Sequence, residues 1–216
     1  MKGNRISVLD IGGGTGWLLD QVKKVDPRVV FTQVVDCSSE AGDYARARGH
    51  CYHEGPLESF ESDKSFDLIL LLNIIEHVEY PVAIMKKVCN LLRPGGFLLL
   101  KTPNVDSLDA RLFRHRDWGG YHCPRHWVLF TRESFLFMIR DLPLKLLTCV
   151  YTQGAPFWTV SLMTMLRNRS WIQADAEHPL DNHPLFGPVS MFAALFDFLR
   201  LPVSKGSQMF MEFRRI

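Results

Sequence analysis

The stretch VLDIGGGTGW, from Val8 to Trp17, constrains the fold of this chain more than any other segment. An apolar run reaches Asp10, and four of the next six residues are glycine. Glycine weakens a regular helix or strand, so this density predicts a tight turn with a backbone bare enough for a ligand to approach closely. The glycines follow the pattern GxGxG, and Trp17 stands where the dinucleotide-binding fingerprint GxGxxG has its third glycine. Because no P-loop Lys-Ser/Thr pair follows either, the turn favours a nucleoside without a pyrophosphate.

Strand and helix patterns alternate from the N-terminus to about residue 102, which predicts a doubly wound α/β fold with a parallel sheet. The continuous apolar run FDLILLLN is typical of a strand buried on both faces. After Pro81 apolar residues recur at helical spacing, and RPGG at 93–96 is expected to be a turn. The expected strands are 5–11, 29–36, 50–55, 66–73 and 97–102, and the expected helices are 17–25, 38–49 and 81–92.

Ligands of such sheets bind at the carboxyl ends of the strands, so the segments that follow the strands should converge on one cleft. These segments are the glycine turn, Asp36, Gly55–Glu58, Asn73–His77 and Thr102–Asn104. Asp36 ends the second strand about 20 residues after Gly16, where a carboxylate can accept hydrogen bonds from a ribose diol. The structural alternative for Asp36 is capping of the following helix.

The strand–helix alternation stops after residue 104. Residues 105–130 are rich in Arg, His and Trp and are too long for a plain connection. A helix at 131–141 and a strand at 143–153 follow, and a last strand is expected at 207–215. Between these two strands lie apolar helices at 157–167 and 186–201. The two late strands are candidates for an antiparallel edge of the sheet.

Composition excludes several classes of protein. The net charge is +2 with scattered basic residues, so no nucleic-acid-binding surface is expected. The five cysteines are odd in number and form no CxxC, which indicates reduced thiols in a cytoplasmic protein. The start of the chain reads as a strand and not as a signal peptide, and no transmembrane segment is expected. The apolar helix at 186–201 is expected to pack internally or form a homodimer interface, with peripheral membrane contact as the alternative.

Several motifs together resemble the class I S-adenosylmethionine-dependent methyltransferases. They are VLDIGGGTG, VVD at the second strand end, FDLILLLNIIEHVEYP and LLRPGGFLLLKTPN, in that order. The segment from TPNVDSLDARLF to DWGGYHCPRHWVLFTRESF is similar to a bacterial small-molecule subgroup related to the ubiquinone-type O-methyltransferases. The resemblance implies a Rossmann-like, seven-stranded sheet of order 3-2-1-4-5-7-6 with strand 7 antiparallel and lid insertions after strands 5 and 6. It implies one domain over 1–216: a cofactor half at 5–104, an acceptor-side lid at 105–130, and a C-terminal half at 131–216 with a helical insertion at about 157–201.

The resemblance also implies a cofactor, S-adenosyl-L-methionine, with S-adenosyl-L-homocysteine as product. Asp10 would anchor the methionine amino group, Asp36 the ribose hydroxyls, and Leu57 an adenine ring nitrogen through its backbone. Many relatives carry an acid where Pro56 stands, so Glu58 is the candidate to contact the adenine amino group. The full set of implied cofactor residues is Asp10, Gly12, Gly13, Gly14, Gly16, Asp36, Cys37, Leu57, Glu58 and Asn73.

Methyl transfer to an alcohol or amine is helped by a general base with a pKa near neutrality, for which histidine is the natural candidate. Candidate bases are His77, His122 and His126. The candidate acceptor site comprises Trp118, Tyr121, His122, Arg125 and His126, as an aromatic wall with polar groups. The structural alternatives are a loop-holding role for His77, an ion pair for Arg125, and a small core for the aromatic residues. No metal site is expected, because His122, Cys123 and His126 lack a fourth ligand nearby.

The sequence therefore favours an enzyme, a methyltransferase (EC 2.1.1 class) that acts on a small-molecule acceptor, with O-methylation preferred over N- or C-methylation. The alternative from another class is a non-catalytic relative that binds a nucleoside or a partner protein. An NAD(P)-dependent oxidoreductase is a further alternative, disfavoured by Trp17 and by the lack of a Tyr-x-x-x-Lys pair.

Overall fold

The computed structural model describes residues 5–115, 117–175 and 178–216, and the chain forms two compact units. The first unit comprises residues 1–102, 135–149 and 211–216, and the second comprises 103–134 and 150–210. The chain therefore leaves the first unit after residue 102, returns to it for a helix and a strand, leaves again, and ends in it.

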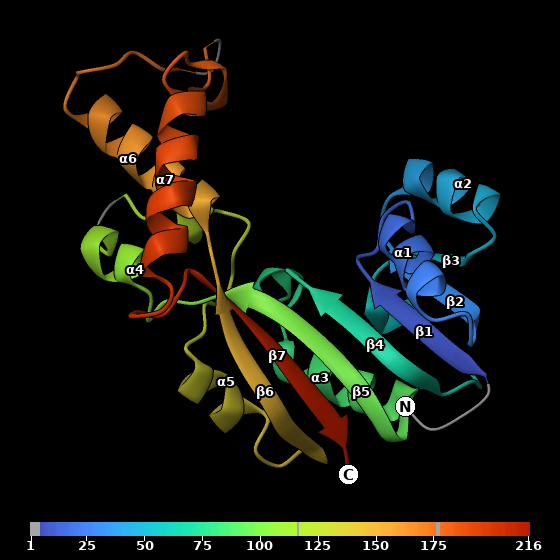
Figure 1. The fold of residues 1–216 in the computed structure, drawn as a ribbon. Helices are drawn as coiled ribbons and strands as arrows, with labels where there is room; N and C mark the ends of the chain where they lie inside the picture. The colour runs from blue at the N-terminus through green and yellow to red at the C-terminus, as the bar shows by residue number, and fades with distance from the viewer. Residues whose placement is uncertain (1–4, 116, 176–177) are drawn as a thin grey trace. The chain divides into compact units, whose positions relative to one another are not determined.

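The sheet has the order β3-β2-β1-β4-β5-β7-β6, which confirms the prediction. Strands β1, β2, β3, β4 and β5 pair in parallel, and β7 runs against its neighbours, as its arrow shows in Figure 1. The strands are β1 (Ile6–Ile11), β2 (Val29–Asp36), β3 (Cys51–Glu54), β4 (Phe66–Leu72), β5 (Leu92–Pro103), β6 (Leu144–Thr152) and β7 (Gln208–Arg215). The helices among them are α1 (Trp17–Val25), α2 (Ser39–Ala47), α3 (Pro81–Leu91) and α5 (Arg132–Met138), with 3-10 turns η1 (Leu57–Ser59) and η2 (Ile75–His77).

Both faces of the central strands are buried, as the continuous apolar runs predict. Val8 and Leu9 of β1 point to opposite faces and neither is exposed to solvent. The same holds for the neighbours Ile69 and Leu70 of β4. One face packs on α1 through Leu19, so burial on both sides fixes the register of the strands that carry the glycine turn and Asp36.

The prediction of a turn at 93–96 (RPGG) is wrong, because strand β5 begins at Leu92 and includes this segment. Leu92 is fully buried opposite Phe66, and the pairing shifts before Leu68 meets Phe97. Gly95 has φ of 79°, which lets the strand bulge at that shift. Burial of Leu92 overrides the local turn preference of Pro-Gly-Gly.

The second unit contains α4 (Leu108–Phe113), η3 (Gly119–Tyr121), α6 (Ala155–Asn168), η4 (Leu180–Asn182) and α7 (Phe186–Arg200). Helices α6 and α7 pack side by side (Figure 1), and their bounds lie close to the helices predicted at 157–167 and 186–201. Across the described residues, no helix is long and apolar enough to cross a membrane.

A buried polar network ties these helices together. The guanidinium of Arg200 forms an ion pair with Asp197 and lies 3.8 Å from the carboxylate of Asp109, and neither acid is exposed to solvent. Asp197 accepts hydrogen bonds from the Gly154 amide at 2.6 Å and the Trp158 indole at 3.0 Å. Asp109 likewise accepts from the Trp118 indole at 2.7 Å and the Ser207 hydroxyl at 2.8 Å. Each carboxylate thus holds one tryptophan and one loop in place.

Removal of one partner from this network should unfold the second unit more readily. We expect Asp197→Ala to lower the free energy of unfolding by about 3–5 kcal/mol, because Arg200 would remain buried without its main counter-charge. Guanidinium titration followed by tryptophan fluorescence measures this, since Trp118, Trp127, Trp158 and Trp171 all lie in the second unit. The control is Asp175→Ala, which removes a largely exposed ion pair with His178 and should cost under about 1 kcal/mol. Equal effects of the two variants would contradict the role of the network.

Candidate functional site

A cavity of about 370 Å³ opens at the carboxyl ends of the first four strands, within the first unit. The residues after β1, β2, β3 and β4 converge there, as expected for a parallel sheet. Six of the residues predicted to bind the cofactor or act as a base line this cavity: Gly12, Asp36, Cys37, Leu57, Glu58 and His77. Its other lining residues are Ile11, Val35, Gly55, Pro56, Ile74, Val78, Glu79 and Ile84.

The glycine turn brings bare backbone to the cavity. Gly12 has φ of 75°, and a Cβ atom there would lie 2.2 Å from the Ile74 side chain. A Cβ atom on Gly13 would lie 2.6 Å from the Asp10 carboxylate. A side chain at either position would therefore collide with a neighbouring residue, which explains glycine at these two positions.

Asp10 is the most perturbed acid of the site. It is 3% exposed, and its Oδ2 atom is buried without a hydrogen-bond partner among the described residues. Burial, and secondarily the Asp36 carboxylate, raise the pKa of Asp10 to about 7. A buried carboxylate with an unsatisfied oxygen beside a second acid favours a cation.

The Asp36 carboxylate contacts the backbone on both of its sides, but the capping role considered for it belongs to Ser38. One carboxylate oxygen accepts a hydrogen bond from the Gly14 amide at 2.9 Å, and the other accepts from the Ser38 amide at 3.0 Å. Ser38 itself caps α2 by accepting from the Ala41 amide. Asp36 therefore orders the glycine turn and the entry to α2, and it also lines the cavity.

The other predicted cofactor residues do not line this cavity; they are Asp10, Gly13, Gly14, Gly16 and Asn73. Asn73 follows β4 with φ of 55°, and its Oδ1 is buried without a hydrogen-bond partner among the described residues. Gly16 begins α1 with φ of 73°, and a Cβ atom there would lie 2.4 Å from the His50 ring. The conformation of Gly16 is thus explained by internal packing against His50.

The segment expected at the cleft, Asn73–His77, was drawn too short. Val78 and Glu79 line the cavity together with Ile74. Glu76 is 1% exposed, accepts a hydrogen bond from the Thr102 hydroxyl at 3.0 Å, and has a pKa raised by burial. The available signal was an acid within the apolar run NIIEHV, a position where a charged residue is rarely buried without a specific reason.

A second cavity, of about 770 Å³, lies within the second unit. Four of the five predicted acceptor-site residues line it, namely Trp118, Tyr121, His122 and His126, whereas Arg125 does not. The other lining residues are Asp117, Gly119, Cys123, Trp127, Leu129, Val160, Thr164 and Arg167. The structure therefore brings the aromatic and histidine residues of the 105–130 segment around one space.

Of the three aromatic residues considered for a small core, Trp118 alone is buried, whereas Tyr121 is 36% exposed and Trp127 65% exposed. Trp118 is buried, and its ring meets Tyr121 edge-on with centroids 5.2 Å apart. The rings of His122 and His126 meet edge-on, with their centroids 5.0 Å apart. His126 Nδ1 lies 2.7 Å from the Gly120 carbonyl oxygen. Because a carbonyl accepts only, Nδ1 is the ring nitrogen that donates in this contact.

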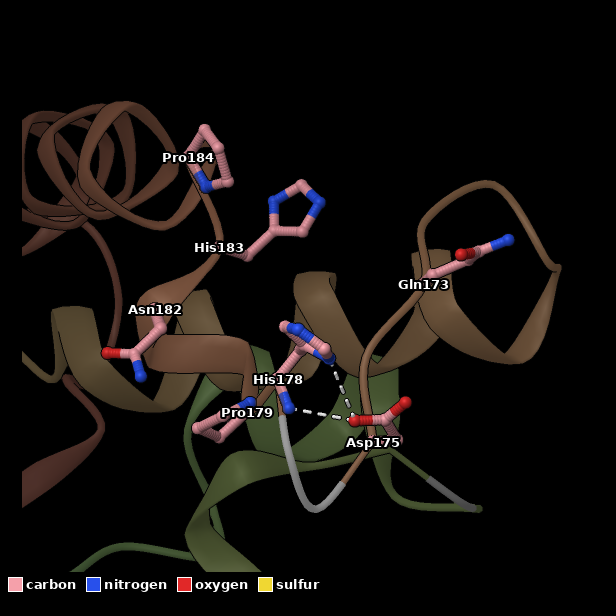
Figure 2. Close-up of a pocket in the computed structure, with 7 residues that line it drawn as sticks. All are labelled: Gln173, Asp175, His178, Pro179, Asn182, His183 and Pro184. Atoms are coloured by element: carbon pink, nitrogen blue, oxygen red, sulfur yellow. Dashed lines mark hydrogen bonds and ion pairs between the residues drawn. The ribbon is translucent and has the colours of Figure 1, made fainter.

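A third cavity, of about 370 Å³, lies in the second unit and is lined by Gln173, Asp175, His178, Pro179, Asn182, His183 and Pro184 (Figure 2). Asp175 accepts a hydrogen bond from the His178 amide at 2.8 Å, and His183 Nδ1 accepts from the Leu185 amide at 3.2 Å. The side chains of Asp175 and His178 are both mostly exposed, so they do not form a buried ligand site.

The raised pKa of Asp10 predicts a measurable penalty on stability. The unfolded chain releases this proton near the ordinary value of 3.8, whereas the folded protein holds it to about pH 7, so stability falls as the pH rises between these values. We expect Asp10→Asn to raise the free energy of unfolding at pH 8 by up to about 4 kcal/mol, and the gain to vanish toward pH 4. Denaturant titrations of both proteins across this range measure it.

The control for this comparison is Asp43→Asn, because the Asp43 side chain is 87% exposed. The stability difference between Asp43→Asn and the unaltered chain should not change with pH. A gain from Asp10→Asn that is the same at pH 4 and pH 8 would contradict the assigned cause.

Comparison with known proteins identifies the family. A family described as "Methyltransferase domain" matches residues 2–148. A ubiquinone biosynthesis O-methyltransferase of Xanthomonas oryzae pv. oryzae is 31% identical over 105 residues, which cover 45% of this chain and 43% of that protein. A tRNA U34 carboxymethyltransferase of Idiomarina loihiensis is 31% identical over 109 residues, covering 46% of this chain and 33% of that protein. The chain thus matches less than half the length of either relative.

The fold is similar to that of the N-methyltransferase NodS from Bradyrhizobium japonicum, solved with S-adenosyl-L-homocysteine. The TM-score is 0.55 at 15% identity, over 99% of this chain and 79% of that one. This likeness agrees with the sheet order and with the strand-end cavity. Since the family match spans most of the chain, the protein belongs to the methyltransferase domain family and has the class I S-adenosylmethionine-dependent fold.

Proposed function

We propose that this protein is a methyltransferase that binds S-adenosyl-L-methionine in the cavity of the first unit. The observation that carries the proposal is Asp10, a buried carboxylate with an unsatisfied oxygen, held against the glycine turn beside Asp36. An ammonium group satisfies such a carboxylate, and a ribose diol satisfies a strand-end acid. The methionine and ribose portions of the cofactor supply these two groups together.

Asp10, which directly precedes the lining residue Ile11, and the residues that line the cavity divide this task among them. Asp10 would hold the amino group, and Asp36, already fixed by the Gly14 and Ser38 amides, would receive the ribose hydroxyls. Cys37 would flank the adenine, the Leu57 backbone would contact a ring nitrogen, and Glu58 would accept from the adenine amino group. When bound, the cofactor supplies an electrophilic methyl group on a sulfonium. The task left to the protein is to align the acceptor and to exclude water.

The acceptor is proposed to be a small molecule with a planar or apolar body, bound in the cavity of the second unit. Trp118, Tyr121 and Trp127 supply aromatic surface there, and Arg167 supplies a cation. Similarity to a ubiquinone biosynthesis O-methyltransferase supports oxygen as the atom methylated. An alcohol oxygen must lose its proton as the bond to carbon forms. The histidines His77, His122 and His126 are the candidates to receive it.

Cofactor binding is tested by calorimetry with S-adenosylhomocysteine, S-adenosylmethionine, NADH and NADPH. We expect the first two to bind and the nicotinamide cofactors not to bind. Asp36→Ala should weaken S-adenosylhomocysteine binding by about 1.5–3 kcal/mol, the range for hydrogen bonds to a charged group. Because Asp36 also holds two backbone amides, thermal unfolding must first show that the variant is folded.

Glu40→Ala on α2 is the matched control, since Glu40 is an exposed acid outside the cavity lining. Its affinity for S-adenosylhomocysteine should be that of the unaltered protein. Binding of NADH without any response to S-adenosylhomocysteine would overturn the proposal. An unchanged affinity of folded Asp36→Ala would remove the ribose assignment alone.

The acceptor site is tested after a metabolite screen with labelled cofactor has found an acceptor. We expect His122→Ala and His126→Ala to lower kcat/KM for that acceptor by about ten-fold or more, with S-adenosylhomocysteine affinity within about two-fold. Arg125→Ala is the matched control, because Arg125 lies between the two histidines in sequence but outside the cavity lining. Equal losses of cofactor affinity and turnover would indicate a structural role. If only Arg125→Ala lost turnover, the acceptor would have to bind outside this cavity.

A further inference from the structure

Helix α7 presents an apolar surface to solvent along most of its length. Its large apolar side chains are 39–74% exposed: Met191, Phe192, Leu195, Phe196, Phe198 and Leu199. They recur at spacings of three and four residues, so they form two adjacent rows on one side of the helix. Phe192 and Phe196 stack on each other with centroids 6.4 Å apart, which makes this surface continuous.

The charged residues of α7 point the opposite way. Asp197 and Arg200 are its only charged residues, and both are buried in the polar network of the second unit. Together with Ala193 they form a buried row at spacings of four and three residues. The helix is therefore polar on its inner side and apolar on its outer side, the reverse of a surface helix in a monomer.

We propose that the outer face of α7 binds a second copy of this chain, with the two helices antiparallel across a two-fold axis. The six side chains offer on the order of 800 Å² of apolar surface, which is about what each partner contributes to a standard-sized interface. Homodimer interfaces are the more apolar class. A face without charge is also self-complementary, because no like charges meet when it packs on itself.

A lipid surface fits this face less well. Helices that lie on membranes carry Lys and Arg on the side facing water and beside the apolar face, where they attract anionic lipids. The one basic residue of α7, Arg200, is turned inward to Asp197. Lys205, just beyond the helix, is paired with Asp106 at 2.5 Å. Helix α7 thus brings apolar area to a contact but no accessible basic group of its own.

Light scattering coupled to size exclusion, and sedimentation over a range of concentrations, test the proposal on the full chain. We expect a dimer. Leu195 lies near the middle of the exposed rows, so Leu195→Glu would place two carboxylates close to the two-fold axis. The dimer dissociation constant should rise at least ten-fold. Met191→Glu is a second variant for the case that Leu195→Glu does not fold, as judged by far-ultraviolet circular dichroism.

Leu112→Glu is the matched control, since Leu112 lies on α4 of the same unit and is 61% exposed, against 58% for Leu195. It should leave the dissociation constant within two-fold. A monomer at 100 µM overturns the proposal. If that monomer also floats with phosphatidylcholine–phosphatidylglycerol vesicles, and Leu195→Glu does not, the partner is lipid. A dimer that resists Leu195→Glu and Met191→Glu equally overturns the proposal as well, because its interface lies elsewhere.

Discussion

The parallel pairing of β1 with β2 and β4 is the constraint on which the candidate site depends. Asp10 lies opposite Val34 on one side and Leu70 on the other, and the glycine turn begins where these strands end. Burial of Val8 and Leu9 on opposite faces holds this register, because a slip of one residue would exchange the faces of the strand. The core thereby brings Asp36 to Asp10 and Gly12, although Asp36 comes from the next strand in the sequence.

The same packing imposes a cost at the site. Asp10 is kept in surroundings that disfavour its charge, and the oxygens of Asp10 and Asn73 are buried without partners among the described residues. Such groups reduce the stability of the folded chain, and they persist where a ligand can satisfy them. The strand ends are therefore the part of the first unit in which stability and ligand binding compete. Elsewhere in that unit, buried polar residues such as His50 and Thr32 satisfy each other.

The second unit distributes polarity differently. Its buried centre contains Arg200 between two carboxylates, while the outer face of α7 is apolar. The family match ends at residue 148, before α6 and α7. What this chain shares with the family is thus mainly the sheet and its strand-end cavity. The features that we assign to the acceptor and to a second copy lie partly or wholly in segments beyond the match.

The sequence patterns alone determined the parallel strands and most of the helices, because periodicity, glycine and proline act locally and the strands are buried on both faces. The order of the strands was expected only from the resemblance to the methyltransferases. The sequence also identified Gly12 and Asp36, whose spacing has a direct physical meaning. It did not show that β5 begins at Leu92, since a Pro-Gly-Gly segment prefers a turn until a distant strand offers Phe66 as a partner. The raised pKa of Asp10, the burial of Glu76 and the inward orientation of Asp197 and Arg200 were likewise decided by tertiary structure. These properties depend on which groups surround a side chain in space. The surrounding groups come from residues more than 25 positions away in the sequence: Asp36 lies beside Asp10, Thr102 beside Glu76 and Trp158 beside Asp197.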